Sequence, residues 1–468
     1  MAEEKSTGNG SSPEIPKSQP APVPAGVSAG AAPAPAAAKP AAAAAPKPAA
    51  PPKKSWPEPK FNEKDGRLLK TTRYWPTELW PHPWQSASYR NGAMMLFGII
   101  AGLLASGAAI GELSTWGDKL YALIAGFVAS HGQPAVVTDV IWVAIKVLIV
   151  LHVVLINGLW AIWWERKISA HIQSRVGPTY AGGFHGWAQT IMDGIKLLLK
   201  EDITPAAADK WVHALAPAIV VAPVVVAFAP VTFGKDLAAA NLDIGVLYIF
   251  AMAGISVIGV VMAGWASGNK YSLLGGLRAS AQLVSYELPR GFSIVPVLMF
   301  AGSLDLSVIA NAQAGYKWGF LPKWFIFYPV VGQLAFLIFL IASIAETNRT
   351  PFDIPEAESE LVSGFHTEYS GMKWSIFFLA EYGYVLLASF LLATFFLGGG
   401  ASPFVFDHVI PSWLWMLGKA MAMMFVFLWV RWTFPRFRSD QLMDFCWKFL
   451  LPWSFANIAF AGLTLFLR

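Results

Sequence analysis

The chain has 468 residues, of which 55% are hydrophobic and 13% charged. Its mean hydropathy of +0.50 exceeds what a soluble domain tolerates, so a membrane protein is expected. The single cysteine, Cys446, excludes a disulfide framework and a multi-thiolate metal site within this chain. Any redox centre that acts with it belongs to a partner. The formal net charge of +5 is informative mainly through where the basic residues lie.

The N-terminal part divides into two segments by composition. Residues 1–60 are rich in Ala and Pro and lack the cationic start and apolar stretch of a signal peptide, so we expect a disordered tail, either passive or a docking arm. Residues 61–135 are expected to approach the membrane, beginning with the Trp-Pro cluster Trp75–Trp84. A weak window rich in Gly and Ala, Ala93–Gly111, either spans the membrane or lies against the helix bundle.

Residues 136–468 are predicted to form an all-α, polytopic transmembrane bundle with eight core spans. A bilayer core of about 30 Å requires about 20 mostly apolar residues per helix. Eight windows have that length and composition: Val140–Trp164, Val212–Phe233, Leu242–Trp265, Leu277–Ala301, Trp324–Ala345, Ser375–Leu397, Trp413–Trp432 and Phe445–Leu467.

Basic residues alternate between the loops and predict the orientation of the bundle. Cationic loops stay cytoplasmic, and every second loop here is rich in Lys and Arg, starting with the loop after Trp164. The loop from Gly398 to Ser412, on the opposite side, has neither. The end of the first strong helix is therefore predicted to be cytoplasmic and the C-terminus to lie outside. If the weak window also spans, the Ala/Pro tail is cytoplasmic.

Four charged stretches interrupt the apolar pattern near the cytoplasmic helix ends, and we expect them to form one polar region. The first runs from Glu165 through Arg166 and Arg175 to an amphipathic segment, Gly186–Glu201. In that segment apolar residues recur at helical spacing opposite a stripe that includes Asp193, which is typical of an interfacial helix. The stripe would be solvated, face a partner or line the mouth of a cavity.

The second stretch places a carboxylate inside a predicted span. Glu287 lies about ten residues into the window that starts at Leu277, close to the middle of the bilayer. A carboxylate there costs several kcal/mol unless it is protonated, paired or hydrated, so a functional role is the default interpretation. A structural ion pair with Arg290, its i+3 neighbour, is the plainer alternative.

The third stretch is an acidic loop from Glu346 to Tyr369. It contains Glu346, Asp353, Glu356, Glu358 and Glu360. Crowded carboxylates have raised pKa values and can store or pass protons, although composition alone favours a solvated loop. Glu381 lies about seven residues inside the next span, so these acids suggest a line from the surface toward mid-membrane.

The fourth stretch, Val430–Gln441, alternates basic and aromatic residues. Such a pattern can bind nucleic acid or lipid headgroups, but between two spans it more often anchors the positive-inside face.

These stretches resemble, in order, the motifs of the quinone-chamber membrane subunits, known as the H subunits, of proton-pumping NADH-quinone oxidoreductase, respiratory complex I. The resemblance covers about residues 140–468. The matching motifs are Glu165-Arg-Lys with Gln173-Ser-Arg-Val-Gly-Pro178, Asn269-Lys-Tyr-Ser-Leu-Leu-Gly-Gly-Leu-Arg278, Ser285-Tyr-Glu287, Ala345-Glu-Thr-Asn-Arg349 with Pro351-Phe-Asp-Ile-Pro-Glu-Ala-Glu-Ser-Glu360, Glu368-Tyr-Ser-Gly371 and Arg436-Phe-Arg-Ser-Asp-Gln441. Thr179 and Met192 depart from the usual residues, and the N-terminal extension lies outside the resemblance.

The resemblance implies an eight-helix wall of the quinone chamber, beside a peripheral arm. In that family, residues matching Glu165, Arg166, Arg175, Asp193, Arg278 and Phe365 line or shape the chamber. Residues matching Glu287, Glu346, Asp353, Glu356, Glu358, Glu360 and Glu381 form the proton-linked path. Quinone would be the bound substrate, with FMN and iron–sulfur clusters held only by partner subunits.

The resemblance also implies partners and a location. Quinone-site, iron–sulfur, small membrane and antiporter-like subunits would surround the chain in a bacterial inner membrane, with lipid and without nucleic acid. The sequence shows no dinucleotide fingerprint and no P-loop, so NADH would be oxidised elsewhere.

Three alternatives remain open from the sequence. The membrane subunit of an energy-converting hydrogenase or of another quinone-linked dehydrogenase shares the scaffold. A proton-coupled transporter would also use intramembrane acids, although no inverted repeat is evident. A haem anchor is weaker, because His152 lies at the middle of its window and His213 at the start of its own, so no facing pair of histidines is evident.

Overall fold

The computed structural model describes residues 113–131, 134–235, 237–317, 321–355, 361–403 and 410–467. The chain divides into two compact units, Met1–Tyr74 and Trp75–Arg468, and every described residue belongs to the second. The tail predicted over residues 1–60 and the weak window Ala93–Gly111 lie outside the described residues.

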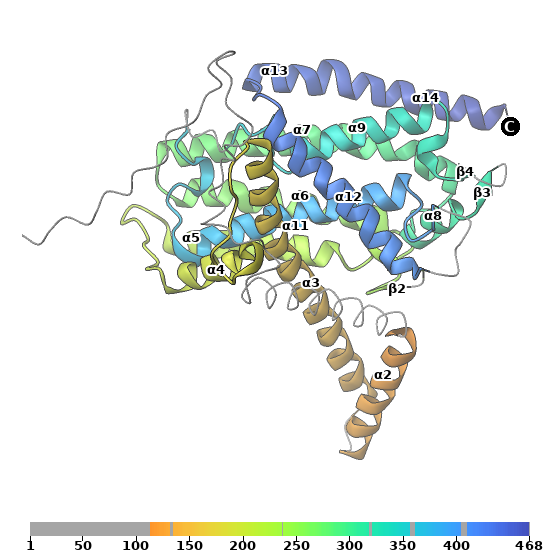
Figure 1. Cartoon of the computed structure of the whole chain (residues 1–468), viewed down its shortest axis with the longest axis horizontal. Coiled ribbons are helices and arrows are strands. Elements are labelled where there is room, and N and C mark those ends of the chain that lie inside the picture. The colour runs from red at the N-terminus through yellow and green to blue at the C-terminus, as the bar shows by residue number, and fades with distance from the viewer. Residues whose placement is uncertain are drawn as a thin grey trace, which may run out of the picture. The chain divides into compact units, whose positions relative to one another are not determined.

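Each of the eight predicted windows contains a helix, which confirms the all-α bundle (Figure 1). The helices are α3 (Ala135–Ile172), α5 (Lys210–Ala227), α6 (Gly245–Ala266), α7 (Lys270–Ala301), α9 (Val331–Glu346), α11 (Gly371–Phe396), α12 (Ser412–Thr433) and α14 (Leu451–Phe466). Six helical segments of the described chain are long and apolar enough to cross a membrane alone. The seventh is α7 taken with the short α8 (Leu306–Ala312), bent by 63°, and α9 has only 16 residues.

Shorter elements join these helices. They are α4 (Gln189–Leu199), α13 (Ser439–Asp444), the single turns η1 (Phe184–Gly186), η2 (Phe325–Phe327) and η3 (Gly364–His366), and the π-helical turn η4 (Phe445–Leu450). Two small antiparallel hairpins pair β1 (Thr232–Gly234) with β2 (Leu237–Ala238) and β3 (Tyr316–Lys317) with β4 (Leu321–Pro322).

Local sequence explains where the helices begin and end. Asp209 caps α5 by accepting from the backbone N–H of Val212, and Asn269 caps α7 by accepting from that of Tyr271. Helix α7 ends at Gly302, which adopts the left-handed conformation (φ 68°) that glycine tolerates best.

The central helix of the bundle is α11. It packs against α3, α5, α9 and α12, and 72% of its most apolar window is buried, the largest share among the candidate spans of the described chain. Gly383 allows close contact with α5, because a Cβ built there would lie 2.5 Å from Val224. Small residues of this kind let membrane helices approach closely.

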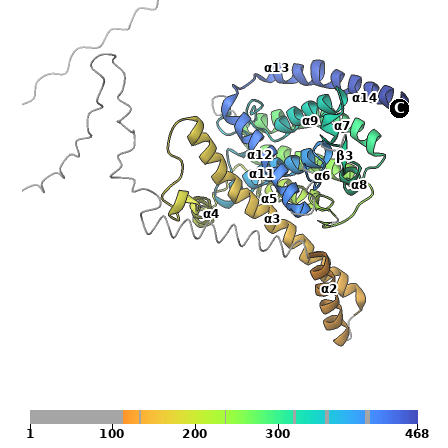
Figure 2. The same cartoon turned by 45° about the vertical axis from the view of Figure 1, so that its right-hand side comes forward.

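Helix α2 (Leu113–Ser130) was not predicted as a separate element and packs beside the N-terminal part of α3 (Figures 1 and 2). Helix α3 itself has 38 residues, about 57 Å at 1.5 Å per residue. It is therefore much longer than a bilayer core is thick.

A candidate site of buried carboxylates around one cavity

A cavity lies between the bundle helices and the turn η3. Its volume is about 680 Å³, counting the space at its open mouth. Its lining includes Val220 of α5, Ala253 of α6, Glu287 of α7, Glu346 of α9, Phe365 of η3 and Glu381 of α11. Most of the other lining residues are apolar, so the carboxylates are placed in a largely apolar surrounding.

Both intramembrane acids predicted from the sequence face this cavity. Glu287 lies against α6, where a Cβ built on Gly254 would be 3.6 Å from its Oε1 atom. Glu381 lines the same cavity from α11. Both carboxylates thus belong to the wall of a cavity within the bundle, which agrees with the high cost of an unpaired charge in hydrocarbon.

Arg290 forms its ion pair with Glu346 of α9. Both side chains are almost completely buried, and the guanidinium carbon lies 5.0 Å from the ring centre of Phe250 and 5.3 Å from that of Phe339. Among the ion pairs of the described residues, Arg290 is joined to Glu346 and not to Glu287, the alternative partner that its sequence position offered. The partner comes from another helix because α7 and α9 pack side by side.

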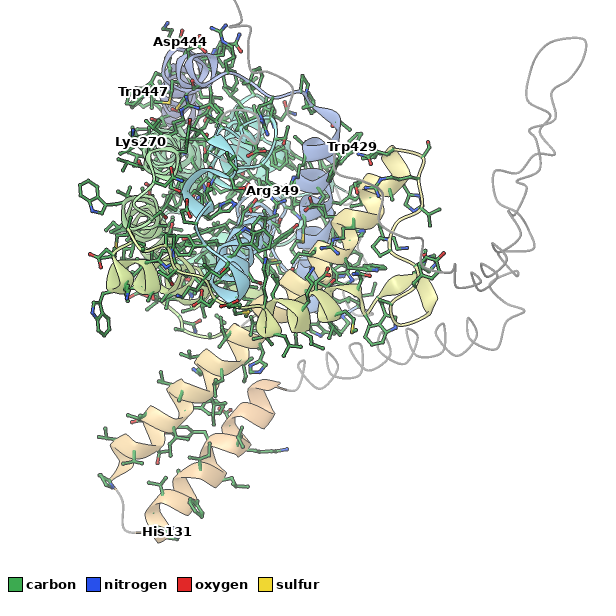
Figure 3. The ribbon with its side chains drawn as sticks, turned by 90° about the vertical axis from the view of Figure 1, so that its left-hand side faces the viewer. His131, Lys270, Arg349, Trp429, Asp444 and Trp447 are labelled. Carbon is green, nitrogen blue, oxygen red and sulfur yellow. The ribbon has the colours of Figure 1, made fainter. Side chains whose placement is uncertain are left out.

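Arg349, in the loop after α9, joins two further carboxylates. Its Nε atom lies 2.7 Å from Glu381 Oε1, and its Nη1 atom donates to Glu165 Oε2 at 3.0 Å. Figure 3 shows Arg349 inside the bundle, and only 1% of its side chain is exposed. Glu165 also accepts from the Tyr382 hydroxyl at 2.7 Å and from Arg431 at 2.5 Å.

These four charges, Glu165, Arg349, Glu381 and Arg431, balance formally. Balance matters because removing one member of a buried ion pair leaves an uncompensated charge. The group links α3, α11, α12 and the loop after α9. It therefore both holds these elements together and sets the electrostatic surroundings of Glu381.

The four charged stretches meet, as expected from the sequence. Gln282 of α7 donates to the backbone oxygens of Ala345 and Phe352, both at 2.8 Å. Asp353 pairs with Arg436 at 2.8 Å. Together with the Glu165 contacts, these bonds bring residues from all four stretches into one polar region.

A second group lies at the surface, on the amphipathic segment. Arg166 pairs with Asp193 at 2.5 Å, and Gln189 also donates to Asp193 at 3.2 Å. Arg175 is exposed and donates to Gln173 at 2.5 Å. The predicted helix there is confirmed as α4, with apolar residues on one side.

The predicted site residues therefore fall into separate sets. Glu287, Glu346, Glu381 and Phe365 line the cavity, and Glu165 joins them through Arg349. Arg278 lies half-buried on α7 outside the cavity lining. Glu356, Glu358 and Glu360 lie outside the described residues.

Sequence reasoning did not assign site roles to Arg349, Arg431, Tyr382 or Tyr384. Tyr384 lines the cavity, and the other three contact Glu165 or Glu381. The available signal was the position of the cations, since a cation at the end of an apolar span requires a nearby acid. Such a cation indicates that an acidic partner lies nearby, but its position in the sequence does not show which acid that is.

The turn η3 closes one side of the cavity with aromatic rings. Phe365 packs edge-to-face on Phe377 at 5.5 Å, and His366 packs on Trp374 and Phe378. Burial among these rings lowers the pKa of His366 to about 4, because the charged imidazolium loses its hydration. The ring is therefore neutral at physiological pH.

Among the described residues, no three His, Cys, Asp or Glu side chains are grouped so that they could hold a metal ion. The carboxylates and the phenol that line the cavity, and the guanidinium groups paired with those carboxylates, can transfer protons, form hydrogen bonds and stabilise charge.

Comparison with known proteins gives consistent matches. The family model described as NADH dehydrogenase matches residues 145–462. The H subunit of NADH-quinone oxidoreductase from Bacillus cytotoxicus is 49% identical over 299 residues, which are 64% of this chain and 86% of that protein. The proteins of the same name from Bacillus mycoides and Bacillus thuringiensis subsp. konkukian are 50% and 49% identical, with the same coverage.

Proposed function

This chain belongs to the NADH dehydrogenase family, and from that premise we propose that it forms the membrane-side wall of the quinone chamber in a proton-translocating NADH-quinone oxidoreductase. It is a multi-pass membrane subunit of that complex. The observation that carries the proposal is the one cavity shared by Glu287, Glu346 and Glu381.

Quinone reduction and this cavity are chemically matched. Conversion of a quinone to a quinol takes two electrons and two protons, and the apolar walls suit a hydrophobic ring. Negative charge that develops on the reduced ring, or its neutralisation by protons, changes the proton affinity of nearby carboxylates. Glu287, Glu346 and Glu381 then exchange protons as a coupled group rather than singly.

Each remaining residue has a role in this proposal. Arg290 and Arg349 hold Glu346 and Glu381 in place through their ion pairs. Phe365 shapes the wall of the chamber, and Arg166, Arg175, Asp193 and Arg278 shape its approach. Asp353, with Glu356, Glu358 and Glu360, extends the carboxylate path beyond the cavity.

Electrons reach the quinone from partner subunits in this proposal. NADH, FMN and the iron–sulfur clusters are bound by those partners, which is supported by the single cysteine and by the sequence's lack of a dinucleotide fingerprint. The chain is embedded in a bacterial inner membrane beside quinone-site, small membrane and antiporter-like subunits. Protonation changes at the cavity bias proton movement in the antiporter-like neighbours.

The variant Glu346→Gln tests this proposal in the assembled complex. The substitution keeps the side chain's shape but removes its titratable proton, so NADH-to-quinone turnover should fall at least about tenfold, a loss in the range of general acid–base effects. Electron transfer from NADH to a water-soluble artificial acceptor should not change, because it bypasses the quinone. Asp444→Asn, which breaks an exposed pair with Lys448, is the matched control.

Normal quinone turnover in correctly assembled Glu346→Gln complexes would remove the proposal. Loss of the artificial-acceptor activity as well would show a defect in assembly, so subunit content is quantified in the same membranes.

A further inference from the structure

The outward face of α3 has a stripe of side chains at coiled-coil spacing, only partly covered by the described chain. The stripe is formed by Thr138, Trp142, Ile145, Ile149, His152, Ile156 and Leu159. Steps of three and four residues place all seven on one side of the helix. The first three lie beside α2 and are buried or half-buried, whereas the last four are exposed.

The uncovered part lies within the membrane. Between Lys146 and Glu165, α3 has no Asp, Glu, Lys or Arg over about 27 Å, close to the thickness of a bilayer core. His152 lies inside this stretch, exposed, with Nδ1 2.7 Å from Leu148 O. A polar, ionisable ring at that depth rarely faces lipid, which indicates that another helix covers this face.

Helix α2 already covers the adjoining part of the same stripe. The Tyr121 hydroxyl donates to Asp139 at 2.7 Å, Tyr121 packs edge-to-face on Trp142, and a Cβ built on Gly117 would lie 3.7 Å from the Trp142 ring. On α2 the contacting positions also follow steps of three and four, through Gly117, Tyr121, Ile124 and Val128.

The sequence before α2 continues this spacing. Counting back from Gly117 by the same steps reaches Ser114, Ile110, Gly107, Leu103 and Ile100, and the last four lie in the apolar window Ala93–Gly111. The window has 19 residues, enough to cross a bilayer core. If the antiparallel register set by Gly117 and Trp142 continued, Ile110 would fall opposite Ile149, Gly107 opposite His152, and Leu103 opposite Ile156.

We propose that residues 93–111 of this chain dock on the outward face of α3 as an additional span, continuing the α2–α3 contact across the membrane. Its glycines and alanines permit close helix approach. Because Trp164, the end of the apolar window in α3, is predicted to be cytoplasmic, the proposal places residues 1–92 on the cytoplasmic side. The family match begins at residue 145, so this span is an addition to the family's bundle.

Paired cysteines in native membranes test the proposed register. Leu103→Cys with Ile156→Cys, and Ile110→Cys with Ile149→Cys, should form intramolecular disulfides with a membrane-permeant oxidant, identified by mass spectrometry of the linked peptides. The native Cys446 is a buried free cysteine in η4, whose thiol donates to Ser285 O. Its state is measured in the same samples as the internal reference for thiol oxidation. Leu104→Cys with Ile156→Cys is the control, because Leu104 is turned about 100° away from the stripe.

Most of each matched pair should be linked and most of the control should not. Equal linking of the control, or capture of Ile156→Cys by another subunit, would overturn the proposal. A single photo-crosslinking residue at Ile156 provides a second measurement if a double variant fails to assemble. Adducts to residues 93–111 support the proposal, and adducts only to lipid or to a different subunit contradict it.

Discussion

Arg349 illustrates how one buried cation organises several acids. It lies between Glu165 and Glu381, while Arg431 reaches Glu165 from another helix. Taking four charges out of water is costly, and their mutual attraction offsets that cost only while every partner is present. The arrangement therefore holds charged groups near the cavity. Loss of any one of them would strongly destabilise the folded subunit.

Replacing Arg349 with Gln should destabilise the subunit by roughly 3–5 kcal/mol, because two carboxylates lose their shared cation. The expected result is a lower thermal midpoint of the purified complex and less of this chain in it, measured by differential scanning and by quantitative immunoblotting. Arg438→Gln removes a surface pair with Asp440 and should leave both readouts unchanged. Equal effects of the two substitutions would contradict the role given to Arg349.

Because His366 is buried in the η3 turn, we expect the stability of this turn to depend on pH. Its pKa is about 4 when buried and about 6.5 when exposed in an unfolded chain, so only the opened turn takes up a proton between these values. Stability of the closed turn is therefore unaffected above pH 6.5 and falls as the pH drops toward 4. Limited proteolysis of residues 361–370 should accelerate over that window.

The variant His366→Phe keeps an aromatic ring and removes the titration, so proteolysis should become nearly independent of pH. His131→Phe changes an exposed histidine and should behave like the parent protein. Unaltered acid sensitivity in His366→Phe would show that another group controls the turn.

Sequence alone located the acids of the site but not their partners. Glu287 and Glu381 stand out because each interrupts an apolar span, and that contrast is local. The partner of Arg290 in the structure, Glu346, depends on how α7 and α9 pack, so it could not be found among the residues that neighbour Arg290 in sequence. Long-range pairing of this kind is not encoded in residue spacing.

At the scale of elements, the helices that hold the site pack closely against their neighbours at glycine residues. A Cβ built on Gly275 of α7 would lie 2.7 Å from the backbone of Gly364 and Phe365, too close for any side chain. The position of η3, and so of Phe365 at the cavity wall, depends on this contact. Helices α6 and α7 meet similarly, because a Cβ on Gly264 would lie 2.7 Å from Ser272 O.

Gly275→Ala should push η3 away from α7 and lower quinone turnover, with a smaller effect on the amount of assembled complex. Overpacking of this kind typically costs about 1–3 kcal/mol. Turnover, and the protease sensitivity of residues 361–370, would be measured together. Gly418→Ala on α12 meets no atom within 4 Å and is the control. A fully active Gly275→Ala complex with a protected turn would contradict the close packing.

The sequence identified long apolar helices more readily than short ones. All eight windows contain helices because apolar length is a strong local signal. Helix α2 was missed because Asp118 and Lys119 interrupt its apolar character. The start of α9 was predicted too early: the helix begins at Val331, after Pro329 and Val330, whose φ is positive (63°).

At the scale of the whole molecule, residues from all four charged stretches meet beside the cavity, inside an apolar bundle. The fold class followed from hydropathy, and the meeting of the stretches followed from their common position at one set of helix ends. The existence and volume of the cavity could not be predicted, because both depend on how side chains of α5, α6, α7, α9 and α11 fill the space between helices.

The central claim is that the carboxylates around this cavity link quinone reduction to proton movement. Its most direct test is the simultaneous measurement of NADH oxidation by quinone and of proton uptake in sealed vesicles, for Glu287→Gln and Glu381→Gln beside Asp444→Asn. Both activities should fall together in the first two variants and stay normal in the third, because the cavity acids serve a single coupled step. Normal turnover with normal proton uptake in assembled Glu287→Gln and Glu381→Gln complexes would contradict the account.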